Sequence, residues 1–256
     1  MKKVILQLML VLGATTVTWS QKPKTKTGQA QTQEQVKTPE QVKTTEQKTE
    51  PSTAEIIGTH FAKKYSIASR WNDLDVAKDA LYDLIVEYPG NDSLIFALAY
   101  YYYEHQAHTS SVLVCQDLLA RDPKNTAALE LAAVGYENLA ILDRSLQSYE
   151  SLFLLTNDKG TLYKMAFLQY RLKRYPECLT NADILLAAPE AGTLKVTYND
   201  KDNKAKEYLL KVALLNLKGM VYKDQADKVN AKKFFDEALA AAPDFLPAKQ
   251  NLEALK

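Results

Sequence analysis

The chain has 256 residues, with 32 Lys and Arg against 31 Asp and Glu, which gives a formal net charge of +1. A chain so nearly neutral lacks the overall basicity with which proteins bind nucleic acid or anionic membrane surfaces. It also lacks a Gly-rich phosphate loop, a Ser nucleophile motif and a pair of catalytic carboxylates, so we expect neither enzymatic activity nor a cofactor.

The first 20 residues have the pattern of a secretory signal peptide. Two lysines precede an apolar run from Val4 to Leu12, and small residues ending at Ser20 provide a cleavage site before Gln21. The run is shorter than the roughly 20 apolar residues that cross a bilayer. We therefore expect residues 1–20 to be removed and the chain to be exported to the bacterial periplasm or cell envelope. The alternative is an uncleaved anchor.

The next segment, residues 21–53, consists largely of Gln, Lys, Thr, Glu and Pro and contains no aromatic residue. It has too little apolar surface to offset the entropy of an ordered chain. A short sequence, Glu34–Thr38, is repeated at Glu40–Thr44. We predict a disordered linker that acts as a passive spacer rather than as a basic tether for anionic lipid or cell-wall polymer.

From about Ala54 the apolar fraction rises, and chain-breaking residues recur at regular intervals. Pro89 and Pro123 are 34 positions apart. Asn157 follows after another 34 positions, and Pro189 after 32 more. Each interval holds two amphipathic helical segments. This spacing predicts a repeat architecture in which each unit is a pair of helices.

The stretch from Leu215 to Pro243 carries the most specific pattern in the chain. It combines small residues, where two helices would touch, with large residues that fill the holes beside them. The spacing resembles that of a tetratricopeptide (TPR) repeat, with Leu in place of the first Trp and Lys in place of the next Leu. The resemblance implies an all-α, TPR-like solenoid of about five helix-turn-helix repeats over residues 54–256. The matching positions are Leu215, Lys218, Gly219, Tyr222, Ala231, Phe235, Ala238 and Pro243.

The last interval, from Pro189 to Pro243, is 54 positions long, about 20 more than one repeat needs. The excess is residues 191–210, where Thr193–Tyr198 alternates polar and apolar side chains before a turn rich in Asn and Asp. We predict an inserted β-hairpin. The alternative is an irregular loop that leads into a longer helix. Beyond Pro243, residues 246–255 are expected to form a short capping helix.

Three features could carry chemistry but have simpler structural interpretations. Cys115 and Cys178 fall at helix-packing positions two repeats apart, too far for a disulfide, so we expect two buried free thiols. His105 and His108 could share one helical face, but a zinc site needs a third ligand and usually a fourth. The turn Asn199–Asn203 has the oxygens of a calcium loop without its Gly and its closing Glu. We therefore expect no metal site.

In TPR proteins the first helix of each repeat lines the inner, concave face, and the resemblance implies the same arrangement here. The register then predicts two aromatic ridges that flank an acidic, amide-bearing middle. Such a surface suits an extended peptide or an amphipathic helix, although the hairpin could fold back and cover part of it. The candidate partner-binding residues are Phe96, Tyr100, Tyr103, Glu130, Val134, Glu137, Asn138, Tyr163, Phe167, Tyr170 and Arg171.

These features predict a non-catalytic scaffold that binds another protein or a peptide segment. Acidic residues outnumber basic ones over residues 54–190, which argues against nucleic acid, and we expect no membrane insertion of the mature chain. Some TPR co-chaperones hold a C-terminal carboxylate with Lys and Asn, but Ala62 and Ser66 occupy those positions here. The alternatives are a glycan-binding envelope protein and a self-associating structural solenoid without a groove ligand.

Overall fold

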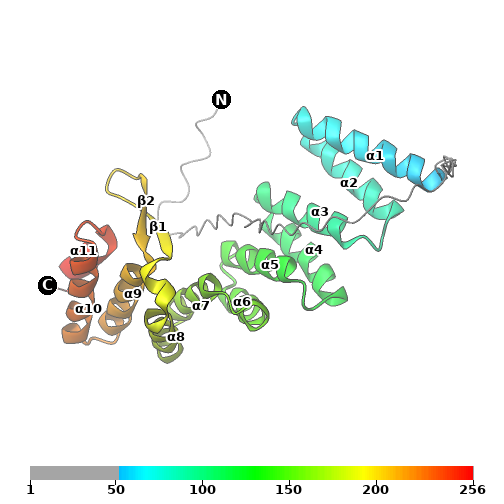
Figure 1. The fold of residues 1–256 in the computed structure, drawn as a ribbon. Helices are drawn as coiled ribbons and strands as arrows, with labels where there is room; N and C mark the ends of the chain where they lie inside the picture. Colours follow the sequence, from blue (N-terminus) through cyan, green and yellow to red (C-terminus); the bar gives the residue numbers. More distant parts are fainter. Residues whose placement is uncertain (1–51, 256) are drawn as a thin grey trace, which may run out of the picture.

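The computed structural model describes residues 52–255 (Figure 1). The predicted signal peptide and nearly all of the predicted linker lie outside these residues. The first helix begins at Thr53. Ser52 caps it, since its hydroxyl accepts a hydrogen bond from the Glu55 N–H at 3.3 Å and its own N–H donates to the Glu55 carboxylate at 2.7 Å. This reciprocal capping satisfies two donors that a helix N-terminus otherwise leaves unpaired.

The described chain is a row of helix pairs that curves into an arc (Figure 1). Five pairs follow one another, a two-stranded hairpin separates the fourth pair from the fifth, and one short helix comes last. The predicted fold class, a TPR-like α-solenoid with a hairpin insertion and a capping helix, is confirmed. The helices are α1 (Thr53–Arg70), α2 (Leu74–Glu87), α3 (Asp92–Glu104), α4 (His108–Arg121), α5 (Thr126–Asn138), α6 (Leu142–Thr156), α7 (Lys159–Arg171), α8 (Tyr175–Ala187), α9 (Leu210–Asp224), α10 (Lys228–Ala241) and α11 (Leu246–Glu253).

Four of the five pairs pack through a small residue on the first helix, whereas in α1 the same repeat position holds the half-buried Tyr65. Gly219 of α9 lies so close to Phe235 of α10 that a Cβ added to the glycine would stand 2.4 Å from the Phe235 ring. Only glycine permits that approach, because the fully buried ring has no space into which it could move. Ala99, Ala133 and Ala166 occupy the same repeat position in α3, α5 and α7, and all three are fully buried. The same contact therefore recurs along the solenoid.

The turn inside every repeat also recurs, and it was not predicted. One residue in each of these turns has a left-handed backbone, with φ between 57° and 60°. A left-handed residue lets the second helix reverse direction within a few positions. None of the five is glycine, the residue that usually signals this conformation, and only Asn72 is of another type that favours it. The residues are Asn72, Gln106, Ala140, Lys173 and Ala226.

The insertion forms a hairpin, as predicted for residues 191–210, and the alternative of an irregular loop is wrong. The two strands are antiparallel, and α9 begins directly after the second strand. Side chains alternate between two faces, as a strand requires: Val196 and Tyr208 are opposite one another and buried, while Glu207 is exposed. The elements of the insertion are the 3-10 turn η1 (Pro189–Gly192), β1 (Lys195–Asn199) and β2 (Ala205–Leu209).

The C-terminal helix α11 closes the apolar end of the last repeat. Phe245, just before α11, and Ala248 within it are fully buried. Both pack with Tyr208, Val212 and Ala238, so one cluster joins the hairpin, α9, α10 and α11. Helix α11 therefore acts as the terminal cap of the solenoid, because it covers the apolar face of the last repeat.

Candidate concave binding surface

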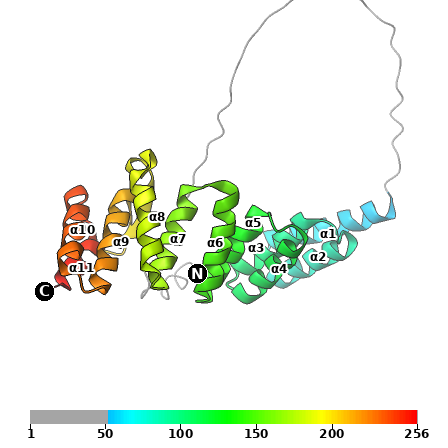
Figure 2. The ribbon, with the colours of Figure 1, turned by 90° about the horizontal axis from the view of Figure 1, so that it is seen from below.

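Helices α3, α5, α7 and α9 lie toward the inner side of the arc in Figure 1. Helix α3 contacts α5, and α7 contacts α9, while each second helix packs against its own first helix. Figure 2 shows the same row of pairs from below, running from α1 to α11. The candidate residues lie on α3, α5 and α7, so the repeat register placed them on the intended helices.

The residues of the first predicted ridge lie on α3. Tyr100 is the most exposed of the three, at 49%, and Phe96 and Tyr103 are half-buried. The Tyr100 and Tyr103 rings are 6.4 Å apart and tilted by 36°. A hydrogen bond to the Glu104 carboxylate raises the pKa of the Tyr100 phenol. The ridge thus offers apolar ring faces together with a hydroxyl beside a carboxylate.

The predicted acidic middle lies on α5 and is partly neutralised by α7. Arg171 Nη1 donates a hydrogen bond to Glu137 Oε1 at 2.9 Å, and this ion pair links the two repeats. Both side chains are partly exposed, so the pair contributes at most about 1 kcal/mol to stability. Asn138 donates to the Val134 carbonyl at 3.0 Å, while Glu130 is exposed. A carboxylate therefore remains accessible in the middle of the surface.

Tyr163 does not belong to the exposed surface, and its prediction as a partner-binding residue is wrong. Only 1% of it is accessible, and its hydroxyl lies 2.9 Å from the hydroxyl of Tyr198 on β1. Burial raises the pKa of Tyr163 well above its usual range and that of Tyr198 to about 12. Both phenols therefore stay protonated, and one donates to the other. The hairpin covers this part of α7.

The other two aromatic residues predicted on α7, Phe167 and Tyr170, are half-buried. Burial, followed by a hydrogen bond to Asp224, raises the pKa of the Tyr170 phenol. Tyr175 of α8 also donates to this carboxylate, at 3.2 Å. The second ridge is consequently narrower than the sequence predicted. Its two rings pack on a cluster formed by Ala166, Cys178, Leu217 and Val221.

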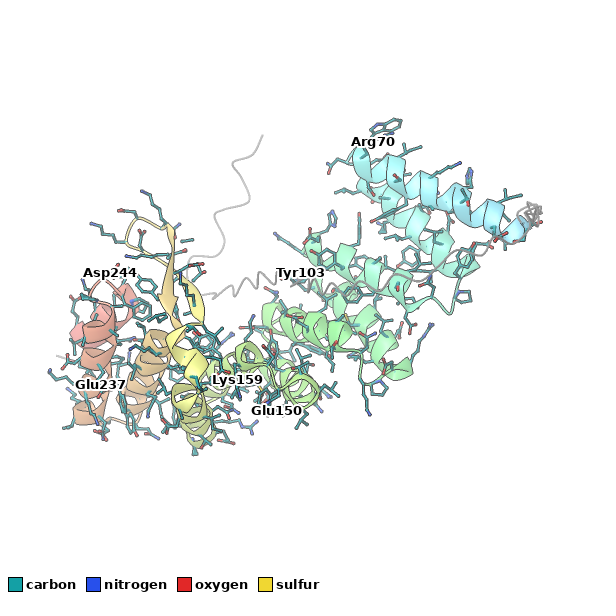
Figure 3. The ribbon with its side chains drawn as sticks, viewed as in Figure 1. Arg70, Tyr103, Glu150, Lys159, Glu237 and Asp244 are labelled. Atoms are coloured by element: carbon teal, nitrogen blue, oxygen red, sulfur yellow. The ribbon has the colours of Figure 1, made fainter. Side chains whose placement is uncertain are left out.

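The hairpin forms a wall at the C-terminal end of this surface. The Tyr198 and Tyr208 rings meet the Phe245 ring edge-on, with centroids 5.0 and 4.9 Å away. Lys206 of β2 forms an ion pair with Asp244 in the turn before α11. In the view of Figure 3 the hairpin stands between Asp244 and the rest of the arc. The hairpin is therefore held from both sides, by α7 and by the α10–α11 turn.

Solved structures share this arrangement of helix pairs. A tetratricopeptide repeat protein from Parabacteroides merdae aligns with a TM-score of 0.60 at 16% identity, covering 78% of this chain and 72% of that protein. The chain has the TPR fold. YrrB, described as a TPR protein with an unusual peptide-binding site, aligns with a TM-score of 0.58 at 12% identity, over 78% of this chain and 99% of YrrB. MamA aligns with a TM-score of 0.57 at 12% identity, over 73% and 92%. No family model and no curated protein matches the sequence.

The TPR surface includes a series of hydrogen-bonded polar side chains that was not predicted. Asn216 of α9 is 4% exposed, and its Oδ1 accepts a hydrogen bond from Asn251 Nδ2 of α11 at 3.2 Å. Asn251 Oδ1 in turn accepts one from Lys223 Nζ at 2.7 Å. Asn216 stands at the same repeat position as Phe96 and Glu130, so the register could have found it. Its partner on α11 lies beyond the repeat pattern and could not have been found that way.

The cysteines and histidines have the surroundings expected of structural residues. Cys115 and Cys178 are buried free thiols, as predicted. Burial raises the pKa of each thiol to about 12, so neither is a thiolate at neutral pH. His105 Nδ1 is in hydrogen-bonding distance of a backbone carbonyl of its own helix. His108 begins α4, and burial lowers the pKa of its imidazole.

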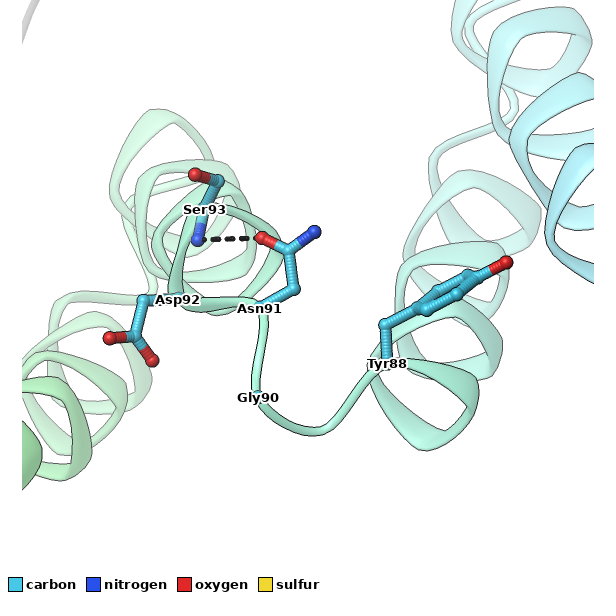
Figure 4. Close-up of a pocket in the computed structure, with 5 residues that line it drawn as sticks. All are labelled: Tyr88, Gly90, Asn91, Asp92 and Ser93. Carbon is cyan, nitrogen blue, oxygen red and sulfur yellow. Dashed lines mark hydrogen bonds between the residues drawn. The ribbon is translucent and has the colours of Figure 1, made fainter. Parts of the chain in front are cut away.

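The described residues offer few other sites. A depression of about 460 Å³ lies at the turn between α2 and α3 (Figure 4), but its polar groups already cap α3, because Asn91 Oδ1 accepts a hydrogen bond from the Ser93 N–H at 3.1 Å. Within residues 52–255 no three His, Cys, Asp or Glu side chains are grouped as metal ligands would be. Over the same residues, every helix is too short or too polar to cross a bilayer.

The buried pair of phenols predicts a non-additive effect on stability. Tyr163→Phe or Tyr198→Phe alone leaves one buried hydroxyl without its partner, and each should lower the free energy of unfolding by about 1–3 kcal/mol. The double variant removes both hydroxyls and should recover part of that loss. Urea unfolding of the four proteins measures this coupling. Strictly additive losses would show that the two hydroxyls do not interact.

Proposed function

We propose that this TPR chain is an exported, non-catalytic scaffold of the bacterial cell envelope that binds another protein through its concave surface. The exposed Tyr100, beside the half-buried Phe96 and Tyr103, carries the proposal. Aromatic side chains of this kind contribute much of the binding energy at protein interfaces. A solenoid holds them in place before the partner arrives, so little ordering is needed on binding.

The charges and rings of the surface indicate what the partner segment would contain. The rings of α3 would take an apolar anchor, and the exposed Glu130 on α5 would favour a neighbouring basic residue. The ion pair between Glu137 and Arg171 already satisfies the next two charges along the surface. YrrB is described as having an unusual peptide-binding site, which supports a peptide segment as the ligand class here.

Replacing the exposed anchor and the exposed carboxylate should abolish partner capture. The full chain and a Tyr100→Ala, Glu130→Lys variant would serve as baits for an envelope extract, with the captured proteins quantified by mass spectrometry. We expect the variant to capture at least roughly tenfold less of the specific partner than the unchanged chain does, because both changes fall at the predicted anchor points. Circular dichroism would check that the variant is folded.

Leu154→Ala provides the control. Leu154 is 84% exposed and lies on α6, a second helix, so its removal leaves the side chains of α3 and α5 in place. This variant should capture the partner as well as the unchanged chain. Equal capture by all three baits would move the site away from the concave surface. Concentration-dependent oligomers in light scattering, without any captured partner, would instead favour the self-associating solenoid.

Export predicts a shortened N-terminus. The intact mass of the protein isolated from its own cells should correspond to a chain that begins at Gln21, because the apolar run before it has signal-peptide length. Recovery of a chain that retains residues 1–20 in the membrane fraction would contradict cleavage and favour the uncleaved anchor. Recovery of that chain in the cytosol would contradict export.

A further inference from the structure

The hairpin leaves one strand edge open. In an antiparallel pair the backbone groups of alternate residues point toward the partner strand, and those of the residues between them point away. Two bonds fix the pattern here: the Leu210 N–H donates to the Leu194 carbonyl at 2.7 Å, and the Asp200 N–H donates to the Lys204 carbonyl at 2.8 Å. The even-numbered residues of β1 therefore face β2. Lys195, Thr197 and Asn199 present their N–H and C=O groups outward.

These outward groups have no hydrogen-bond partner within residues 52–255. Proteins usually block such an edge with a proline, a bulge or unpaired charges. The register of β1 on β2 is continuous, and β1 contains no proline. Its one charge, Lys195, is at the end of the strand and pairs across the hairpin with Glu207 at 3.0 Å. The Asn199 side chain is held by Asn203 at 2.9 Å. The centre of the edge, at Thr197, is unprotected.

The open edge of β1 adjoins the concave surface. Tyr198 of β1 reaches Tyr163 of α7, whereas Lys206 and Tyr208 of β2 reach Asp244 before α11. Strand β1 is therefore on the side of the earlier repeats, and β2 is on the side of the C-terminus, in agreement with the view in Figure 1. A segment that runs along the inner surface from α3 would meet β1 first.

We propose that the outer edge of β1 is a docking site for an extended segment of the partner protein, which adds to the hairpin as a third strand. Only an extended backbone presents N–H and C=O groups at the spacing that Lys195, Thr197 and Asn199 require. The added strand should alternate in character: polar side chains beside Lys195 and Thr197 on the solvent face, and apolar ones beside Tyr198 on the face toward α7. This inference rests on the proposed function and gives the partner segment a conformation.

A single proline tests the edge without breaking the hairpin. Thr197→Pro removes an outward N–H and leaves the bonds between β1 and β2 in place, because proline is tolerated where its nitrogen faces away from the partner strand. Ala205→Pro is the matched control, since Ala205 points its N–H outward from the other edge, on β2. Circular dichroism and the urea midpoint would establish that both variants keep the fold.

The probe is a peptide enriched from a displayed random-peptide library with the full chain as target. We expect such peptides to bind the unchanged chain and Ala205→Pro alike, and to bind Thr197→Pro about tenfold or more weakly, as loss of a main-chain bond and a clash would produce. Methylating the peptide backbone nitrogens one at a time should weaken binding only at alternate positions. Hydrogen exchange at the Thr197 amide should slow on binding.

Other outcomes would overturn the inference. If Thr197→Pro binds the peptides as tightly as the unchanged chain does, or if no peptide is enriched, strand addition at β1 is wrong. If binding is lost in Tyr100→Ala but kept in Thr197→Pro, the concave surface binds protein and only the strand geometry fails. If the free chain dimerises and Thr197→Pro abolishes the dimer, the occupant of the edge is a second copy and not a partner peptide.

Discussion

The close approach of the two helices within each repeat is the contact on which the rest of the structure depends. A glycine or alanine on the first helix lets the second helix come near enough to fill the space with a larger side chain, as Phe235 does against Gly219. Because the same contact recurs in the second to fifth pairs, these pairs have a similar shape, and stacking similar units leaves their first helices on one side of an arc. The concave surface is a consequence of this packing.

The hairpin changes that surface without disturbing the packing. It is inserted between two pairs, where extra residues do not interrupt a helix. Its Tyr198 contacts both Tyr163 of α7 and Phe245 in the turn before α11. Helices satisfy their own backbone groups and offer a partner only side chains. A strand edge offers backbone donors and acceptors. The insertion therefore adds a kind of recognition that the helical repeats alone do not have.

The sequence predicted the features that depend on local pattern. Prolines and turn residues about 34 positions apart marked the repeats, alternation of polar and apolar side chains marked β1, and helix-packing positions marked the two buried thiols. Each of these signals is a spacing of residue types along the chain and needs no knowledge of long-range contacts. The left-handed turn residues could not be predicted in this way, because none is glycine and four of the five are Gln, Ala or Lys, which rarely adopt this conformation.

The burial of Tyr163 could not be predicted in the same way. Its repeat position holds the half-buried Phe96 and the exposed Glu130 in the two preceding repeats, and Tyr198, the residue that covers it, is 35 positions away in the insertion. Only the docked position of the hairpin decides between an exposed and a buried ring. The same holds for Asn216, whose partner lies on the capping helix after the last repeat. The repeat register therefore does not determine the long-range contacts of elements outside the repeats, such as the hairpin and the capping helix.

The docking of the hairpin as a wall of the concave surface is tested most directly by amide hydrogen exchange of the free, full-length chain. The inward-facing amides of Val196, Tyr198 and Tyr208 should exchange far more slowly than the outward-facing amides of Thr197 and Glu207, since only the former are hydrogen-bonded. That alternation would establish the docked hairpin and its free edges together. Uniformly fast exchange across all five amides would contradict it and leave the C-terminal end of the surface without a wall.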